Sequence, residues 1–174
     1  SGVAVTTSSK ITIYKGSLSP QKLIKTKNYK NIFHTTPIQS IIGHARMETN
    51  GSFYNDFNNQ PIIKDDIVTI HNGIVVNDTQ IWKTNYDLKR IYQVDTEIIN
   101  SLTSKYFMET KSIIRACQNT FHDIEGSASI SQLFSNLNHL LLASNTGSLY
   151  YFFGPNNSFF IFASYQQCLL RRSK

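Results

Sequence analysis

The first residue of the chain and three short polar stretches carry the side chains that could do chemistry. Ser1 bears the free α-amino group, and the small apolar residues that follow it in SGVAV indicate a strand that begins at a buried terminus. The polar stretches are GHARMETNG with Arg46, IHNGIVV with Asn72 and Gly73, and VDTEII with Asp95. An N-terminal residue can supply a nucleophile and its base together, because a free α-amine has an ordinary pKa of about 7.7–8.0.

Each polar stretch, taken alone, also has a purely structural interpretation. Asn72-Gly73 between two apolar runs is typical of a type I′ hairpin turn. Arg46 fits a polar position on a half-buried strand, and Asp95 precedes a helical pattern as an N-cap would. Taken separately, these stretches favour structure over chemistry.

In their order along the chain, the same stretches resemble one family, the class II glutamine amidotransferases. SGVAV is similar to that family's Cys-Gly-Ile/Val start, and GHARMETNG to its Gly-His-x-Arg-aromatic-x-Thr-x-Gly segment. NNQPI resembles an Asn-x-His/Gln-Pro element, IHNGIVVN a His-Asn-Gly-x-x-x-Asn segment, and VDTEII an Asp-Thr/Ser-Glu helix start. The late SFFIFASYQQCLL resembles a family strand that ends in Ala-Ser and leads into a helix, so the resemblance spans residues 1 to 168.

The resemblance implies a role for seven residues. They are Ser1, Asn72 and Gly73 in catalysis, and Arg46, Thr49, Asn50 and Asp95 in glutamine binding. The Arg46 guanidinium would bind the glutamine α-carboxylate and Asp95 the α-ammonium. The Asn72 amide and the Gly73 N–H would form the oxyanion hole.

Three positions depart from the family pattern. Met47 replaces an aromatic residue, Asn50 stands where histidine is common, and Ser1 replaces the cysteine nucleophile. A thiol with a pKa of about 8.5 is partly thiolate at neutral pH, whereas a serine hydroxyl must lose its proton to a base during attack. Three accounts of Ser1 stay open: an introduced Cys-to-Ser change that inactivates the enzyme, a natural serine nucleophile, or a degenerate domain that binds without hydrolysing.

The elements that must position these residues read as an α+β fold. Strand patterns cover residues 2–6, 11–14 and 40–46, flank residues 71–73, and return four times after residue 126. Helical spacing appears at residues 95–110 and 111–122. The resemblance adds the expected architecture, a four-layer αββα sandwich of two antiparallel sheets (the N-terminal nucleophile hydrolase fold), with the N-terminus at the edge of the central sheets. At 174 residues, we expect one glutamine amidotransferase domain over residues 1–174.

The implied function is a glutaminase that converts glutamine to glutamate. It would supply ammonia to a synthase domain or subunit in nucleotide, modified-base or sugar biosynthesis, without a cofactor. No synthase segment is recognisable in the sequence, so the acceptor would lie on another chain or on a further portion of this one. An amidase that uses Ser1 on another amide is an alternative.

The charge of the chain suggests a rival of a different class. The net charge is +6, and the segment KLIKTKNYK places Lys22, Lys25, Lys27 and Lys30 around Tyr29. Such a patch could contact nucleic acid or an acidic partner, which would make the chain a basic α+β adaptor module. We favour a solvated helix face or loop instead, because no nucleic-acid motif accompanies the lysines.

The cysteines, the histidines and the apolar runs indicate which other classes of protein are not expected. Cys117 and Cys168 lie far apart, so we expect reduced, structural thiols rather than a disulfide framework. The histidines have no metal-ligand spacing, and no apolar run reaches the roughly 18 residues of a membrane helix. We therefore expect a cytoplasmic protein without a metal and without membrane contact.

Overall fold

The computed structural model describes residues 1–8, 10–34, 37–45, 56–134, 137 and 139–170. Three β-strands make the first sheet: β1 (Gly2–Thr6), β2 (Ile11–Lys15) and β3 (Ser40–His44), in the antiparallel order β2-β1-β3. Side chains of β1 alternate between the two faces. Val3 and Val5 pack against Ile32 of helix α2 (Lys27–Ile32), which together with α1 (Pro20–Leu23) covers the outer face of this sheet.

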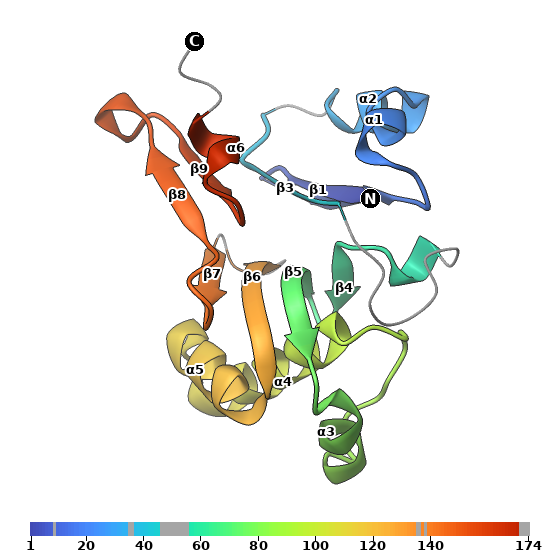
Figure 1. The fold of residues 1–174 in the computed structure, drawn as a ribbon, viewed down its shortest axis with the longest axis vertical. Coiled ribbons are helices and arrows are strands. Elements are labelled where there is room, and N and C mark those ends of the chain that lie inside the picture. The colour runs from blue at the N-terminus through green and yellow to red at the C-terminus, as the bar shows by residue number, and fades with distance from the viewer. Residues whose placement is uncertain (9, 35–36, 46–55, 135–136, 138, 171–174) are drawn as a thin grey trace.

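The second sheet has four antiparallel strands in the order β4-β5-β6-β7. They are β4 (Ile62–Lys64), β5 (Ile67–Val75), β6 (Gly126–Phe134) and β7 (Leu140–Ser144). Helices α4 (Thr96–Thr110) and α5 (Ile113–Asp123) cover its outer face, and α3 (Asp78–Thr84) packs at one end (Figure 1). Ile98, Ile99 and Leu102 of α4 are fully buried against Val75 and Ile130 of the sheet.

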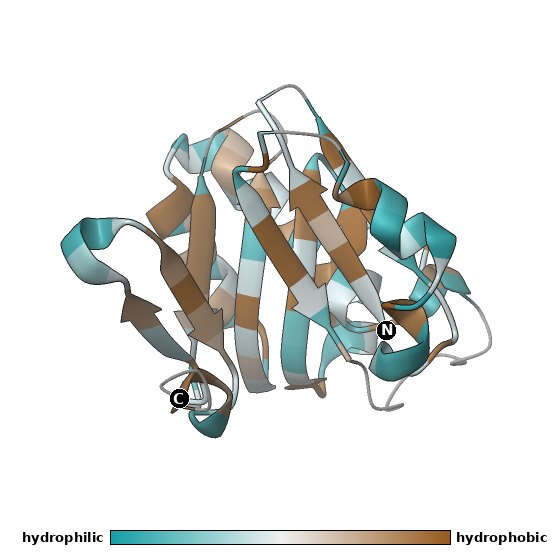
Figure 2. Cartoon of the chain, turned by 90° about the horizontal axis from the view of Figure 1, so that it is seen from above, coloured by the Kyte–Doolittle hydropathy of each residue, from teal (hydrophilic) through white to brown (hydrophobic). Residues whose placement is uncertain are grey.

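The inner faces of the two sheets pack on each other. Ala4 and Ile42 from the first sheet share a buried cluster with Val68, Ile70 and Leu133 from the second. The layers therefore run helix, sheet, sheet, helix, and Figures 1 and 2 show the two sheets stacked between the helical layers. The predicted α+β, four-layer αββα architecture is confirmed.

A separate hairpin extends beside the sandwich. It consists of β8 (Tyr150–Phe153), a 3-10 turn (Pro155–Asn157) and β9 (Phe160–Ala163), followed by α6 (Gln167–Leu170). Phe162 reaches the buried cluster between the sheets, whereas Tyr151, Phe152 and Phe153 are all more than half exposed. Within the described residues, no helix is both long and apolar enough to cross a membrane.

The structure corrects three expectations from the sequence. Asn72-Gly73 is not a hairpin turn, because both residues lie inside the nine-residue strand β5 and pair with Ser129 and Ala128 of β6. Strand β1 is the middle strand of its sheet, so Ser1 lies at the end of an interior strand rather than at a lateral edge. Cys117 is buried as expected, and burial raises the pKa of its thiol to about 11, but Cys168 is exposed, which does not fit a structural thiol.

Candidate active site

The N-terminus is held in place by backbone carbonyls. Ser1 is 5% exposed, and its α-amine donates to the Gly16 oxygen at 2.9 Å and to the Leu18 oxygen at 3.1 Å. The Gly16 N–H in turn donates to the Ser1 carbonyl at 3.0 Å. A chain end normally frays, so these three bonds fix the position of Ser1 to a degree that an ordinary terminus lacks.

The segment that binds the α-amine is itself anchored from a distant part of the chain. Asp56, in a short 3-10 helix (Asp56–Asn58), accepts hydrogen bonds from the Ser17 N–H at 2.7 Å and from the Ser17 hydroxyl at 2.8 Å. Lys15 donates to the carbonyls of Phe57 at 2.9 Å and Pro61 at 3.0 Å. Residues 56–61 therefore support the loop that binds the N-terminus.

The Lys15 ammonium is an unusual component of this support. Burial lowers the pKa of Lys15 to about 8, against an opposing attraction from Asp56. The ammonium also lies 5.5 Å from the centre of the Tyr92 ring. Lys15 could not be predicted from the sequence as part of this support, because a single lysine at the end of a strand carries no distinguishing pattern.

Asn72 and Gly73 lie where β5 continues past its fully buried part. Asn72 is exposed and Gly73 is half-buried. Gly73 has a φ of +146°, and a Cβ atom placed there would lie 2.6 Å from the Ser127 carbonyl carbon and closer still to its oxygen. Only glycine fits this backbone conformation and this close approach of β6.

Asp95 occupies the predicted N-cap position of α4 but does not cap the helix. Its side chain makes no capping hydrogen bond, and its Oδ2 atom accepts instead from the Val75 N–H at 2.9 Å. The carboxylate is buried, with Oδ1 at 3.9 Å from the His71 Nδ1 atom. Asp95 thus joins the start of α4 to the end of β5, two residues beyond Gly73.

His71 lies between these elements as a buried neutral ring. It is 2% exposed, and burial lowers its pKa below the ordinary value, although the nearby Asp95 carboxylate and the Ser127 carbonyl oppose that shift. The ring contacts the Thr96 hydroxyl at 3.4 Å and the Ser127 carbonyl oxygen at 3.3 Å. A histidine held in this way packs against Gly73 rather than serving as an exposed base.

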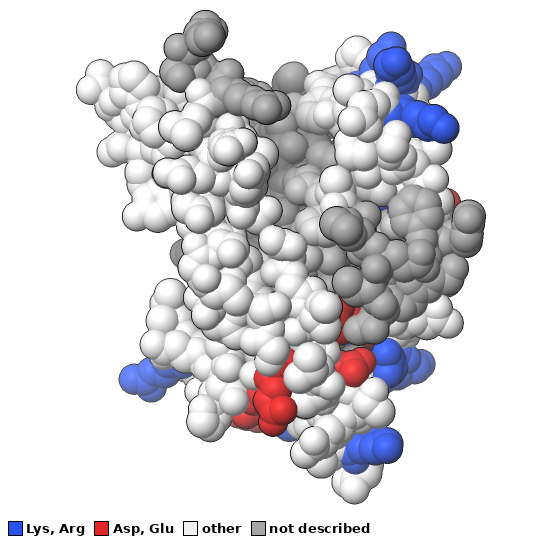
Figure 3. Space-filling view, viewed as in Figure 1, with Lys and Arg blue, Asp and Glu red and all other residues white. Residues whose placement is uncertain are grey.

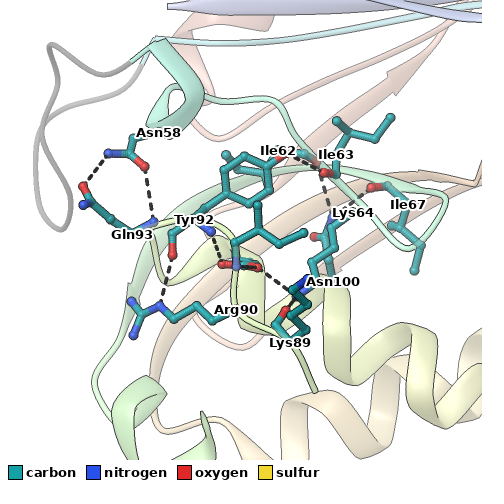
Figure 4. A network of polar contacts seen from close by, with 12 residues as sticks. Asn58, Ile62, Ile63, Lys64, Ile67, Lys89, Arg90, Tyr92, Gln93 and Asn100 are labelled. Atoms are coloured by element: carbon teal, nitrogen blue, oxygen red, sulfur yellow. Dashed lines mark hydrogen bonds and ion pairs between the residues drawn. The ribbon is translucent and has the colours of Figure 1, made fainter. Parts of the chain in front are cut away.

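The loop before Asp95 is fixed by a buried ion pair and by amide contacts (Figure 4). Lys64 donates to Glu97 at 2.8 Å, and Glu97 accepts from the N–H groups of Ile91 at 2.6 Å and Tyr92 at 2.7 Å. The Asn58 side chain exchanges two hydrogen bonds with Gln93, at 3.0 and 3.2 Å. Lys64 and Ile63 of β4 also bond to Lys89 and Tyr92, so this network holds residues 89–93 against β4 and helps to fix the position of Asp95 just before α4.

The predicted binding residues Arg46, Thr49 and Asn50 lie outside the described residues. Strand β3, which precedes them, ends at His44, and His44 pairs with Gly2 of β1. In the part of the chain that the structure describes, no group of three or more His, Cys, Asp or Glu residues could hold a metal ion.

Comparison with known proteins identifies the family. Residues 44–171 match the family described as the glutamine amidotransferase domain, which covers well over half of the chain. The chain belongs to the class II glutamine amidotransferases. The resemblance drawn from the motifs of the sequence is therefore confirmed at the level of the family.

Two curated relatives illustrate how this domain occurs elsewhere. Amidophosphoribosyltransferase from Archaeoglobus fulgidus is 32% identical over 101 residues, which cover 55% of this chain and 22% of that protein. Glutamine–fructose-6-phosphate aminotransferase (isomerizing) from Zymomonas mobilis is 28% identical over 146 residues, which cover 79% of this chain and 23% of that protein. The chain thus spans less than a quarter of the length of these relatives.

Two solved structures share the fold. Glutamine phosphoribosylpyrophosphate amidotransferase from B. subtilis superposes with a TM-score of 0.64 at 20% identity, over 94% of this chain and 35% of that one. A structure described as the allosteric regulatory enzyme of purine biosynthesis gives a TM-score of 0.60 at 20% identity, over 86% of this chain and 32% of that one. Both confirm the N-terminal nucleophile hydrolase fold for this chain.

Proposed function

We propose that the chain is a glutaminase domain in which residue 1 is the nucleophile position. The observation that carries this proposal is the buried α-amine, held by the Gly16 and Leu18 carbonyls in a chain of this family. The substrate would be L-glutamine and the products glutamate and ammonia. With Ser1 in place of the family's cysteine, we expect the chain to bind glutamine and to hydrolyse it slowly or not at all.

The α-amine would serve as the base for the side chain of residue 1. The bonds to the Gly16 and Leu18 carbonyls would orient the amine, which in its neutral form carries one lone pair. The lone pair then accepts the proton that the nucleophile releases as it attacks the glutamine amide carbon. The same proton passes to the leaving nitrogen, so that ammonia departs, and water then hydrolyses the acyl intermediate to glutamate.

The other site residues would stabilise charge and hold the substrate. As the family resemblance implies, the Asn72 side-chain amide and the Gly73 N–H would donate to the oxyanion that forms during attack. Asp95 would receive the α-ammonium group. Arg46 would bind the α-carboxylate, and Thr49 and Asn50 would line the same pocket.

The first experiment compares glutamate release by the unmodified chain and by Ser1→Cys, each with a verified free N-terminus, with calorimetric titration of glutamine alongside. We expect hydrolysis by Ser1→Cys and binding without comparable turnover by the Ser1 form. A third variant, Ser1→Cys with one extra residue added at the N-terminus, has no α-amine on the nucleophilic residue and should lose activity. Failure of every form to bind or cleave glutamine would overturn the proposal.

The same assay distinguishes the natural serine amidase. Equal hydrolysis of glutamine by the Ser1 and Ser1→Cys forms, or cleavage of other amides by the Ser1 form alone, would indicate a native serine nucleophile.

The ammonia acceptor is proposed to be a synthase domain or subunit in nucleotide, modified-base or sugar biosynthesis. The names of the relatives, an amidophosphoribosyltransferase and a glutamine–fructose-6-phosphate aminotransferase, support that range.

A basic face on the outer helical layer supports the adaptor alternative. Lys22, Lys25, Lys27 and Lys30 are all exposed on and around α1 and α2, and Figure 3 shows blue side chains gathered there. A nucleic-acid interface at this face would bind oligonucleotides with an affinity that falls steeply with salt. Replacing the four lysines by glutamine should abolish such binding, whereas it should leave glutamine hydrolysis by the Ser1→Cys form unchanged.

A further inference from the structure

The side chain of Gln60 contacts two of the three elements that carry the candidate site residues, and its backbone contacts the third. Gln60 is 6% exposed and lies just before β4. We propose that Gln60 is a positioning residue, which fixes the N-terminal nucleophile, the Asn72-Gly73 segment and Asp95 relative to one another. This inference rests on the proposed glutaminase function.

The side-chain amide of Gln60 makes the hydrogen bonds to β5 that a residue of a neighbouring strand would make. Its Nε2 atom donates to the His71 carbonyl at 2.9 Å, and its Oε1 atom accepts from the His71 N–H at 2.6 Å. The register of the β4–β5 pair, with Ile62 opposite Thr69, would place residue 60 opposite His71 if β4 continued. The amide thus makes the two bonds that a backbone would otherwise make, on the residue directly before Asn72.

The backbone of Gln60 forms the contact with the N-terminal strand. A Cβ atom at Gly2 would lie 2.5 Å from the Lys15 Cβ atom and 3.0 Å from the Pro61 Cδ atom, and closer still to the Gln60 carbonyl oxygen. Gly2 therefore lies directly against the Gln60-Pro61 peptide. Since Gly2 follows Ser1, this contact limits where the nucleophile can sit.

A third contact reaches the start of α4. The Gln60 Nε2 atom also donates to the Thr96 hydroxyl at 3.2 Å, and Thr96 is 0% exposed and follows Asp95. All three hydrogen bonds of the amide are buried, so no water can replace them without a rearrangement. The motif NNQPI supplied a family match in the sequence, but only the structure shows that its glutamine joins three separate elements.

Catalysis depends on the positions of the nucleophile, the oxyanion donors and Asp95 relative to one another, and the Gln60 contacts matter because together they fix these positions. The attacking atom, the oxyanion donors and the group that binds the α-ammonium come from β1, β5 and the start of α4. A displacement of about 1 Å at such a site can cost on the order of 10²-fold in rate. We therefore expect loss of the Gln60 amide to lower kcat/KM by about that factor while the fold persists.

The test uses Gln60→Met, a neutral side chain of similar length without hydrogen bonds, in the Ser1→Cys form. The matched control is Gln132→Met, because Gln132 is a second buried glutamine whose amide donates to two hydroxyls. Its partners, Thr69 in β5 and Thr103 in α4, are neither site residues nor their neighbours in the sequence. We expect about a 10²-fold loss of kcat/KM for Gln60→Met and less than a few-fold change for Gln132→Met. Gln60→His, which keeps one donor and one acceptor, should recover part of the activity.

Equal losses in the Gln60→Met and Gln132→Met variants, or unchanged kcat/KM in Gln60→Met, would overturn the positioning role. Urea unfolding of both variants separates a loss of stability from a loss of positioning.

Amide hydrogen exchange provides a readout that needs no activity. In the Ser1 form, Gln60→Met should accelerate exchange at His71, in the first residues of β1 and at the start of α4 together, and Gln132→Met should not. If no form binds or cleaves glutamine while these three regions respond together, the proposed function fails and the coupling by Gln60 stands. If Ser1→Cys is active and exchange changes only at His71, the positioning inference fails and the proposed function stands.

Discussion

Substitution of Gly73 by alanine tests most directly whether the oxyanion segment has the geometry described above. The added Cβ would lie 2.6 Å from the Ser127 carbonyl carbon and 2.9 Å from the His71 Nε2 atom, and closer still to the Ser127 oxygen. The carbonyl belongs to strand β6, which pairs with β5 along its whole length, and the His71 ring contacts its oxygen at 3.3 Å, so it has little room to move. The φ of +146° is also one that residues with a side chain rarely adopt.

The expected loss of stability has two parts. Holding a non-glycine residue in such a sparsely populated backbone conformation costs about 1–3 kcal/mol. Forcing an extra carbon into a packed strand pair costs about 1–3 kcal/mol. Gly73→Ala should therefore lower the free energy of unfolding by about 2–6 kcal/mol, the sum of these two estimates.

Gly147 provides the control for the conformational part alone. Its φ is +73°, and a Cβ there would have no neighbour within 4 Å. Gly147→Ala should lower the free energy of unfolding by only about 1–2 kcal/mol. Urea denaturation of both variants gives the comparison, and a Gly73→Ala variant no less stable than Gly147→Ala would refute the close approach of β6.

Three further predictions concern buried titratable groups. Glu97→Gln leaves the Lys64 ammonium buried beside a neutral partner, so the free energy of unfolding should fall by about 3–5 kcal/mol in urea denaturation, and a change below about 1 kcal/mol would contradict the buried pair. The pKa of Lys15, lowered by burial to about 8, means that between about pH 8 and 10.5 the unfolded chain holds a proton that the folded chain has lost. Stability relative to Lys15→Met should therefore rise with pH across that window, by up to about 3 kcal/mol, and a flat difference would contradict the shift. The pKa of His71 is lowered by burial in the folded chain, so stability should fall as pH drops below about 6.5, where the unfolded chain binds the proton first. Urea denaturation between about pH 5 and 7 should show a shallower slope for His71→Asn than for the unmodified chain.

The sequence predicted the regular elements well where the hydrophobic period was strong. The helix expected over residues 95–110 is α4 (Thr96–Thr110), and the strand expected over residues 2–6 is β1 (Gly2–Thr6). For the lysine-rich segment after residue 15 the sequence left open a loop or a helix face, and the structure has two short helices, α1 and α2. Each of them buries only one side chain, Leu23 or Ile32. One apolar position in a short segment is too little for a period to emerge.

The turn expected at Asn72-Gly73 failed for a different reason. A dipeptide that favours positive φ predicts a reversal only if the chain on either side pairs with itself, and sequence gives no information on pairing with distant segments. Here the strand on both sides of Gly73 pairs with β6, which lies more than 50 residues later in the chain. At this position glycine is needed because the Ser127 carbonyl lies too close for a side chain, and not because the chain reverses direction.

The same limit applies to the connections that make a site out of separate motifs. The order of the motifs indicated that Ser1, Asn72 and Asp95 belong to one site. It gave no information on which atoms hold these three residues in position relative to one another. Gln60 stands in a loop 11 residues before His71 and 36 before Thr96, and it reaches both because β4 ends just where its amide can replace a strand. Such a contact depends on where pairing stops, which is a property of the folded sheet. If Gln60 proves to control the reaction, the residues most worth testing in related chains are the buried amides at strand ends next to the site, since a sequence motif does not show which elements such an amide joins.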